Sequence, residues 1–177
     1  MKVNIKILHP DAIIPKYQTS GSAGFDIHAI EHTEIYPGET KVLKTGLSFE
    51  IPEEYELQIV PRSGISAKTK LRISNSPGTI DSDFRGEVGI IVDNIDFHSD
   101  KKIPYIIKIG DRIAQGKITP VIQATFIEVD NLEETERGKE GFGSTGIGAF
   151  NTINSSYDTK TTYVKPKYIT LTNEKKD

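Results

Sequence analysis

Residues 75–89 of the chain read NSPGTIDSDFRGEVG and place turn residues, two aspartates and one aromatic ring between apolar segments. Pro77-Gly78 is a strong turn signal, and the apolar residues of segment 88–92 alternate as in a half-buried strand. The pattern predicts a β-hairpin with exposed polar backbone. On an extended backbone Asp81 and Asp83 would share one face, so that one carboxylate could act as a general base beside the other. Asp and Gly are also common in turns, and this stretch alone favours the turn explanation.

Short apolar segments bounded by Gly or Pro continue on both sides of this stretch. The strand-like segments are 2–8, 25–27, 34–36, 42–51, 54–60, 103–109 and a β-rich run over 112–129. A short helical turn after Arg62 and through Lys70 is the only helix that the sequence predicts. Strands of this length at short intervals predict an all-β barrel or sandwich.

Composition narrows the class of protein. The chain has 177 residues, which favours one domain with a tail, and its net charge of −3 argues against a non-specific duplex nucleic-acid binder. It has no cysteine, and its four histidines are scattered, so neither a thiolate site nor a zinc site is expected. No window approaches the ~18 apolar residues that a membrane span needs, and no signal peptide is recognisable. These features predict a soluble protein of the cytoplasm, or of the host cytoplasm or nucleus if its source is viral.

The apolar periodicity ends near Asn131. We predict a β domain over 1–130, a flexible arm over 131–146 and a polar extension over 147–177 that is disordered or depends on a partner. A weak strand at 168–171 is the best structural candidate in the extension.

Two further clusters suit an anion. Arg62-Ser63-Gly64 offers a guanidinium, a hydroxyl and an exposed N–H at a helix start, although a surface turn is an equally ordinary explanation. The glycine-rich segment 141–146 lacks the Lys-Ser/Thr pair of a phosphate-binding P-loop. Its backbone N–H groups with Ser144 and Thr145 could still wrap an anion, with Arg137 as a bidentate partner, unless the segment is a plain flexible terminus.

Five motifs in one order resemble those of the trimeric dUTP pyrophosphatases, the dUTPases. They are AGFDI at 23–27, PRSGIS at 61–66, the stretch at 75–89, GDRIAQ at 110–115 and RGKEGFGSTG at 137–146. The resemblance covers residues 1 to about 146 and leaves out the extension. It implies a distorted β-barrel of the jelly-roll or β-clip type, assembled as a homotrimer with a flexible C-terminal arm. It also implies hydrolysis of dUTP to dUMP and pyrophosphate with Mg²⁺, which limits uracil incorporation into DNA and supplies dUMP for dTMP synthesis.

The resemblance assigns roles within the 75–89 stretch. Asp81 matches the general base that activates the water attacking the α-phosphorus, and Asp83 is expected to be structural. Phe84 matches the aromatic that packs on the deoxyribose and excludes a 2′-hydroxyl, a position where many members carry Tyr. Uracil recognition is expected from Asn75 and from the backbone of three other residues, Thr79, Ile80 and Gly89.

The resemblance places the phosphate chain against the second and fourth motifs. Ser63, Gly64 and Gln115 match phosphate contacts, and Arg62 is expected to organise the site through Asp26. No direct protein ligand to Mg²⁺ is expected, since the triphosphate and water would hold the ion, with Asp26 acting through water.

The arm would close the site. Phe142 is expected to stack over uracil, Arg137 to meet the terminal phosphate, and Gly143 and Ser144 to contact substrate. Motifs one, two and four would come from one subunit, motif three from a second and motif five from a third.

Two alternatives remain open at this point. A dCTP deaminase-type relative would share the fold and act on the exocyclic amine of cytosine. A regulatory binding protein would engage a protein partner through the fold or through residues 147–177.

Overall fold

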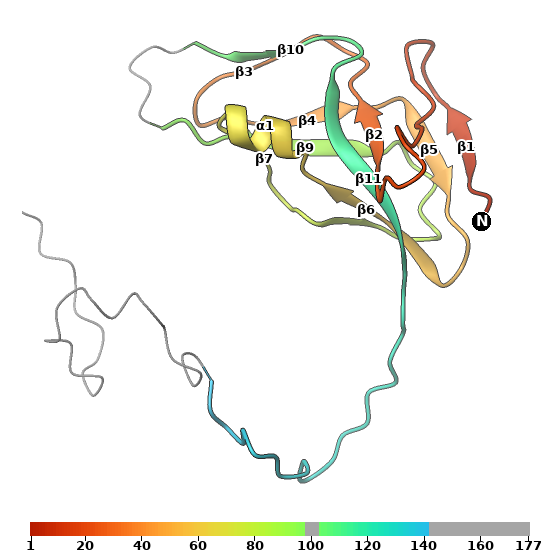
Figure 1. Ribbon diagram of the computed structural model, residues 1–177, viewed down its shortest axis with the longest axis vertical. Coiled ribbons are helices and arrows are strands. Elements are labelled where there is room, and N and C mark those ends of the chain that lie inside the picture. Colours follow the sequence, from red (N-terminus) through yellow and green to blue (C-terminus); the bar gives the residue numbers. More distant parts are fainter. Residues whose placement is uncertain (98–102, 142–177) are drawn as a thin grey trace, which may run out of the picture. The chain divides into compact units, whose positions relative to one another are not determined.

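The structure is a computed structural model that describes residues 1–97 and 103–141 (Figure 1). Residues Met1–Thr125 form one compact unit, and the chain from Phe126 onward is a separate unit. Within the described residues all regular secondary structure lies in the first unit. It comprises β1 (Asn4–Ile7), β2 (Phe25–His28), β3 (Thr33–Ile35), β4 (Thr40–Lys44), β5 (Leu47–Glu50), β6 (Tyr55–Val60), α1 (Ser63–Lys68), β7 (Leu71–Ile73), β8 (Gly78–Ile80), β9 (Gly89–Asn94), β10 (Tyr105–Ile107) and β11 (Arg112–Pro120).

The strands form four antiparallel sheets. The largest has the order β2-β11-β6-β8 and the next β4-β9-β7, while β1 pairs with β5 and β3 with β10. The predicted all-β class and the single short helix are therefore confirmed. Among the described residues these pairings do not close into one continuous barrel.

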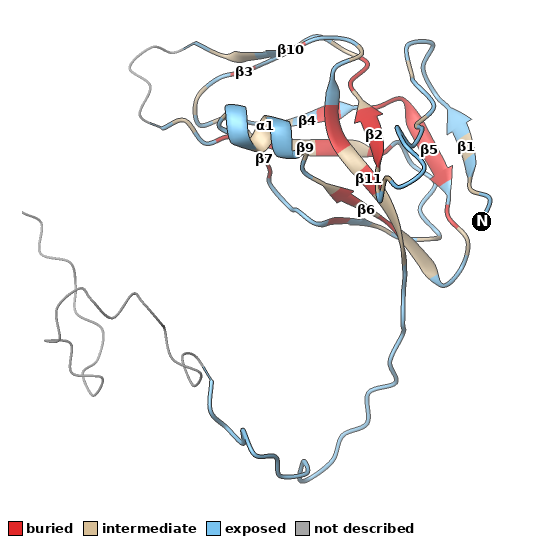
Figure 2. Cartoon of the chain, viewed as in Figure 1, coloured by how far each residue is buried: buried red, intermediate tan, exposed pale blue. Residues whose placement is uncertain are grey.

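β11 runs through the middle of the compact unit and joins β2 to β6 (Figure 1). Its inner face is buried, as are β2 and the centre of β9 (Figure 2). Gly116 on β11 lies directly under the ring of Phe25, and a methyl group there would overlap that ring. The core is made of apolar side chains from the two larger sheets and from β3 and β5, and its members buried to 1% exposure or less are Ile27, Ala29, Ile35, Leu43, Leu47, Leu57, Val88, Ile90 and Ala114.

The hairpin predicted for residues 75–89 is wrong in its pairing. β8 pairs with β6, through Leu57↔Ile80 and Ile59↔Gly78, whereas β9 pairs with β4 and β7. Asp81 begins a turn, in which the backbone N–H of Phe84 donates to the Asp81 carbonyl over 3.2 Å, so the extended geometry assumed for the two carboxylates does not hold. The segment is instead a long connection between β7 and β9 that contains the short strand β8. The expected alternation over 88–92 is confirmed, because β9 buries every second residue.

Residues 42–51 also depart from prediction, since they form two strands and not one. β4 joins the sheet of β9, and β5 pairs with β1. Between them Gly46 has a positive φ of 66°, a conformation that favours glycine. The left-handed residue turns the chain from one sheet into another, which an alternating apolar pattern does not reveal. The β-rich run likewise ends at Pro120 and does not continue to Val129.

Gly46→Ala is expected to destabilise the fold by about 2–5 kcal/mol, from left-handed strain and overpacking together. A methyl group at Gly46 would lie 2.8 Å from Cβ of Ala12 and 2.9 Å from Cβ of His9. Gly110 is the matched control, because its φ is 83° and a methyl group there would meet nothing within 4 Å. Urea unfolding should show a loss of only about 1–2 kcal/mol for Gly110→Ala. Equal losses would contradict the packing argument.

Candidate functional site

A cavity of about 520 Å³ brings three of the sequence motifs together. The loop before β2 forms one wall, the junction of β6 and α1 a second, and β11 a third. The residues that line it are Gln18, Ser22, Ala23, Gly24, Asp26, Val60, Arg62, Ser63, Gly64, Arg112, Gln115 and Lys117. We call this cavity the anion pocket.

Asp26 lies at the centre of the charges in the anion pocket. Its side chain is only 9% exposed, and it faces two arginines: Oδ1 accepts a hydrogen bond from Arg62 Nε over 2.9 Å, and Oδ2 forms an ion pair with Arg112 Nη1 at 3.5 Å. Arg62 also donates through Nη1 to the carbonyl of Arg112 over 3.4 Å. The structure thus brings Asp26 and Arg62 together as expected, and it adds Arg112, which the sequence argument did not select.

Strand register explains why residues distant in sequence meet here. Gln115 on β11 stands opposite both Asp26 on β2 and Val60 on β6. Its side-chain Nε2 donates to the carbonyl of Pro61 over 3.2 Å, and the residue lines the pocket. Ser63 and Gly64 are exposed at the start of α1. Hydroxyl, amide and backbone groups therefore surround two guanidinium groups, an arrangement suited to phosphate oxygens.

Asp81 lies in a different concavity. This second cavity measures about 750 Å³ and shares no lining residue with the anion pocket. It is lined by Glu53, Glu54, Tyr55, Glu56, Asp81, Ser82, Asp83, Val121, Ile122 and Gln123. The carboxylate proposed from the sequence as a base and the residues proposed as phosphate contacts thus line separate hollows of one chain.

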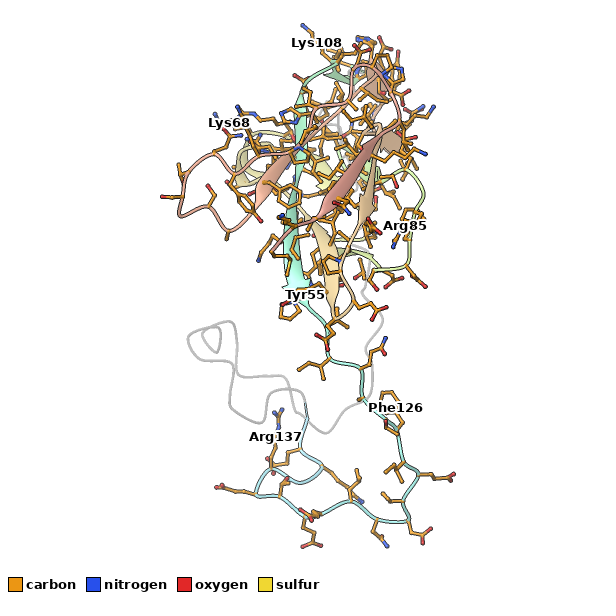
Figure 3. All side chains as sticks on the ribbon, turned by 90° about the vertical axis from the view of Figure 1, so that its right-hand side faces the viewer. Tyr55, Lys68, Arg85, Lys108, Phe126 and Arg137 are labelled. Carbon is orange, nitrogen blue, oxygen red and sulfur yellow. The ribbon has the colours of Figure 1, made fainter. Side chains whose placement is uncertain are left out.

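The turn that carries Asp81 is held by Arg85, which donates through Nη1 to the carbonyls of Ser82 and Phe84 over 2.6 and 3.0 Å. Arg85 lies at the side of the compact unit (Figure 3). Phe84 is 42% exposed, and its ring covers Gly86, where a methyl group would lie 2.5 Å from Cζ. Any side chain at this position would overlap the tip of the Phe84 ring where it now lies.

The expected uracil-recognising residues are spread over two sheets. Thr79 and Ile80 belong to β8, Gly89 begins β9, and Asn75 is exposed in the turn before β8. The amide nitrogen of Asn75 would lie 3.1 Å from a methyl group at Gly78, so the Asn75 side chain folds over that glycine. These residues are close in sequence, but β8 and β9 pair with different strands.

Arg137 is exposed in the second unit, where its Nε donates to the carbonyl of Glu140 over 3.1 Å. Figure 3 labels this side chain. Phe142, Gly143 and Ser144 lie outside the described residues, so their expected roles stay predictions.

The described part of the chain lacks a membrane-spanning helix and a cluster of metal-ligating side chains. No helix there is long and apolar enough to cross a membrane. No group of three or more His, Asp or Glu side chains in residues 1–97 and 103–141 is arranged to hold a metal ion.

His28 ends β2 beside the Asp26 cluster, by which we mean Asp26 with Arg62 and Arg112. Within the described residues its buried Nδ1 has no hydrogen-bond partner. Burial lowers the pKa of His28 below 6.5, and the guanidinium groups of Arg112 and Arg62 add to this, while Asp26 opposes it. The neutral imidazole is therefore the form that the native state favours.

The lowered pKa of His28 predicts a loss of stability in acid. The unfolded chain binds a proton at the ordinary value of 6.5, whereas the native chain does so only at lower pH. The contribution of neutral His28 to the free energy of unfolding is complete above pH 6.5 and declines as the pH falls below that value. Urea unfolding at about pH 7.5 and pH 5.5 should show a smaller acid loss for His28→Leu than for the parent chain. His32, which is exposed, supplies the control: His32→Leu should keep the parent's pH dependence, and an unchanged dependence in His28→Leu would contradict the assignment.

Sequence reasoning missed Arg112, Lys117 and Gln18 as pocket residues. Arg112 was within reach, because it lies inside the GDRIAQ motif, whereas Gln18 and Lys117 have no motif to mark them.

Comparison with known proteins decides the family. The sequence model of the dUTPase family matches residues 10–146. The chain belongs to the dUTPase family. The identification made from five motifs is thereby confirmed, and residues 147–177 lie outside the matched range.

Several dUTPases illustrate the similarity. The deoxyuridine 5′-triphosphate nucleotidohydrolase of Nautilia profundicola is 53% identical over 146 residues, 82% of this chain and 99% of that protein. The enzyme of Helicobacter pylori strain P12 is 46% identical over 147 residues, 83% of this chain and 98% of that protein. The dUTPase of Staphylococcus bacteriophage 80alpha, solved with dUpNHpp, is 30% identical with a TM-score of 0.74, over 82% of this chain and 99% of that one. A dUTPase of Staphylococcus aureus phage phi11, 28% identical with a TM-score of 0.70 over 76% of this chain and all of that one, coordinates a structural Mg(II) ion.

Proposed function

We propose that this protein hydrolyses dUTP to dUMP and pyrophosphate by attack of water on the α-phosphorus. The observation that carries the proposal is the anion pocket, in which Asp26 pairs with two arginines beside the exposed Ser63 and Gly64 and the half-buried Gln115. The reaction limits uracil incorporation into DNA and supplies dUMP for dTMP synthesis. The bacterial relatives support placing this activity in the cytoplasm.

Asp81 is the proposed general base. Its carboxylate is exposed and lines an open hollow, so that water and substrate can reach it. It would orient and deprotonate the water that attacks the α-phosphorus. Asp83 is proposed to shape the same turn.

The residues around β8 are proposed to read the base. Uracil presents acceptor, donor and acceptor in a row, and backbone groups of Thr79, Ile80 and Gly89 can pair with that edge, with Asn75 completing the set. Cytosine reverses two of these groups and would leave buried partners unpaired, at a cost of ~1–3 kcal/mol each. Recognition by backbone also leaves little room for the methyl group of thymine.

Phe84→Ala is expected to reduce the preference for dUTP over UTP, measured as a ratio of kcat/KM, by roughly 10–100-fold. The half-exposed ring is available to pack against the sugar face and to occupy the space of a 2′-hydroxyl. Phe97→Ala is the matched control, because Phe97 is 73% exposed and lines neither cavity. Equal turnover of dUTP and UTP by the parent chain would refute this role of Phe84.

Mg²⁺ is the proposed cofactor, held mainly by the triphosphate and water. The donor set fits this arrangement: the described residues offer no protein cage, and both Asp26 oxygens already face arginines, so Asp26 would act on the ion through water at most. When bound, the ion neutralises charge on the phosphate oxygens. Arg62 and Arg112 would share that task from the protein side.

A homotrimer is the proposed assembly. Two observations support it. The Asp81 hollow and the anion pocket are separate on one chain, so one subunit's pocket could face another's Asp81. The segment that follows β11 also exposes large apolar side chains, which favours packing on a second copy. These are Val121, Ile122, Phe126, Ile127, Val129 and Leu132.

The arm of a third subunit is proposed to complete the site. Arg137 would meet the terminal phosphate, Phe142 would stack over uracil, and Gly143 and Ser144 would contact the substrate as the arm closes. A protein-binding role of residues 147–177, outside the range shared with the family, stays a prediction.

Incubation of the protein with dUTP and with dCTP tests the proposal against a deaminase. Pyrophosphate should appear from dUTP and depend on Mg²⁺, and dCTP should yield neither ammonia nor pyrophosphate at a comparable rate. Ammonia from dCTP would overturn the proposal.

A further inference from the structure

Lys117 lies on the wall of the anion pocket, two residues beyond Gln115 on β11. Successive side chains of a strand point to opposite faces, so Gln115 and Lys117 share one face. The opposite face carries Ala114 and Gly116, which are buried in the core. The register of β11 therefore directs Lys117 into the pocket and away from the interior.

Gly24 lies close to the side chains of Gln115 and Lys117. A methyl group at Gly24 would lie 3.3 Å from Oε1 of Gln115 and 3.5 Å from Cγ of Lys117. It would also lie 3.2 Å from the carbonyl oxygen of Gly116. The loop before β2 thus packs closely on β11, beside the lower part of the half-buried Lys117 side chain.

The charges of the pocket leave Lys117 available to a ligand. Asp26 is the pocket's one carboxylate among the described residues, and it pairs with Arg62 and Arg112. Lys117 forms no ion pair with any carboxylate of residues 1–97 and 103–141. Three cations against one carboxylate give the pocket a positive balance, which suits a polyphosphate.

We propose that Lys117 binds the phosphate chain of the substrate, beside the contact expected from Gln115. This inference rests on the proposed function, since it names a further binding residue of the same pocket. Its ammonium group supplies a point charge and three donors to phosphate oxygens, which the amide of Gln115 cannot supply. The effect belongs to binding, because Lys117 stands on the pocket wall and not in the Asp81 hollow.

The test compares Lys117→Met with Lys117→Arg and with Lys108→Met as a matched control. Lys108 is exposed at the end of the compact unit and lines neither cavity (Figure 3). Lys117→Met should raise the KM for dUTP by roughly 10-fold and leave kcat within about 2-fold, as expected for loss of one partly exposed charge-assisted contact. Lys117→Arg should restore most of the affinity, and the KM of Lys117→Met should rise less steeply with salt than that of the parent chain. A KM of Lys117→Met equal to that of Lys108→Met would overturn the inference.

Binding of inorganic tripolyphosphate, measured by calorimetry, separates the inference from the proposed function. The parent chain should bind it roughly 10-fold more tightly than Lys117→Met does. If the parent chain failed to hydrolyse dUTP yet showed this difference, the proposed function would fail and the role of Lys117 would stand. If dUTP were hydrolysed and tripolyphosphate bound equally to both, Lys117 would have no role in binding.

Discussion

Asp81→Asn is expected to lower kcat for dUTP by about 10²–10⁴-fold, with little change in the affinity for a non-hydrolysable dUTP analogue. The amide keeps the size and polarity of the carboxylate but cannot accept the proton of the attacking water. Asp81 is exposed at the start of its turn, and the turn depends on the Asp81 backbone carbonyl and on Arg85, so the substitution should leave the fold intact. Single-turnover rates and analogue binding measure the two effects separately.

Asp83→Asn is the matched control for Asp81, because both carboxylates line the same hollow. The control should keep kcat within about 10-fold of the parent value. If Asp83→Asn were the slower of the two variants, the assignment of the base would be reversed.

Asp26→Asn is expected to cost about 2–4 kcal/mol of unfolding free energy and to weaken substrate binding at the same time. The Asp26 side chain is 9% exposed and is shared by two guanidinium groups, so its loss leaves two neighbouring cations without their counter-charge. The estimate lies below the full cost of breaking a buried pair, since Arg112 is 52% exposed and solvent screens part of the effect. Urea unfolding and the KM for dUTP measure the two effects.

Asp11 provides the comparison for Asp26. It faces His9 in a surface pair at 3.7 Å, with both side chains about half exposed. Asp11→Asn should therefore change the unfolding free energy by less than about 0.5 kcal/mol and leave KM unaltered. Similar losses in the two variants would show that the Asp26 cluster is not the organising charge centre described above.

The alternation of apolar and polar residues predicted the individual strands well, because a strand with one buried face carries an apolar residue at every second position. β9 is an example, since its buried positions recur at every second residue. The break in segment 42–51 was missed because it depends on one left-handed glycine, Gly46, and on the crowding around it. Nothing in the apolar period distinguishes a strand that continues from one that turns into another sheet.

The motifs selected some of the residues that line the anion pocket but not the geometry that brings them together. Motif order identified Asp26, Arg62 and Gln115, yet their meeting depends on β11 pairing with both β2 and β6, which are distant in sequence. The same long-range pairing draws in Arg112 and Lys117. Long-range pairing also explains why the hairpin predicted for residues 75–89 was wrong, because β8 pairs with β6 and not with β9, the next strand along the chain.

We propose that the anion pocket of one subunit works with Asp81 of another. The most direct test of this proposal mixes two inactive variants, Asp81→Asn and the double variant Ser63→Ala, Gln115→Ala, within the same trimers by co-expression. In a random mixture of equal amounts, about one site in four would combine an intact pocket with an intact Asp81 from different subunits. We expect dUTP hydrolysis to return to about a quarter of the parent rate, although each variant alone is nearly inactive. Mixed trimers that form but stay as inactive as their parents would contradict it.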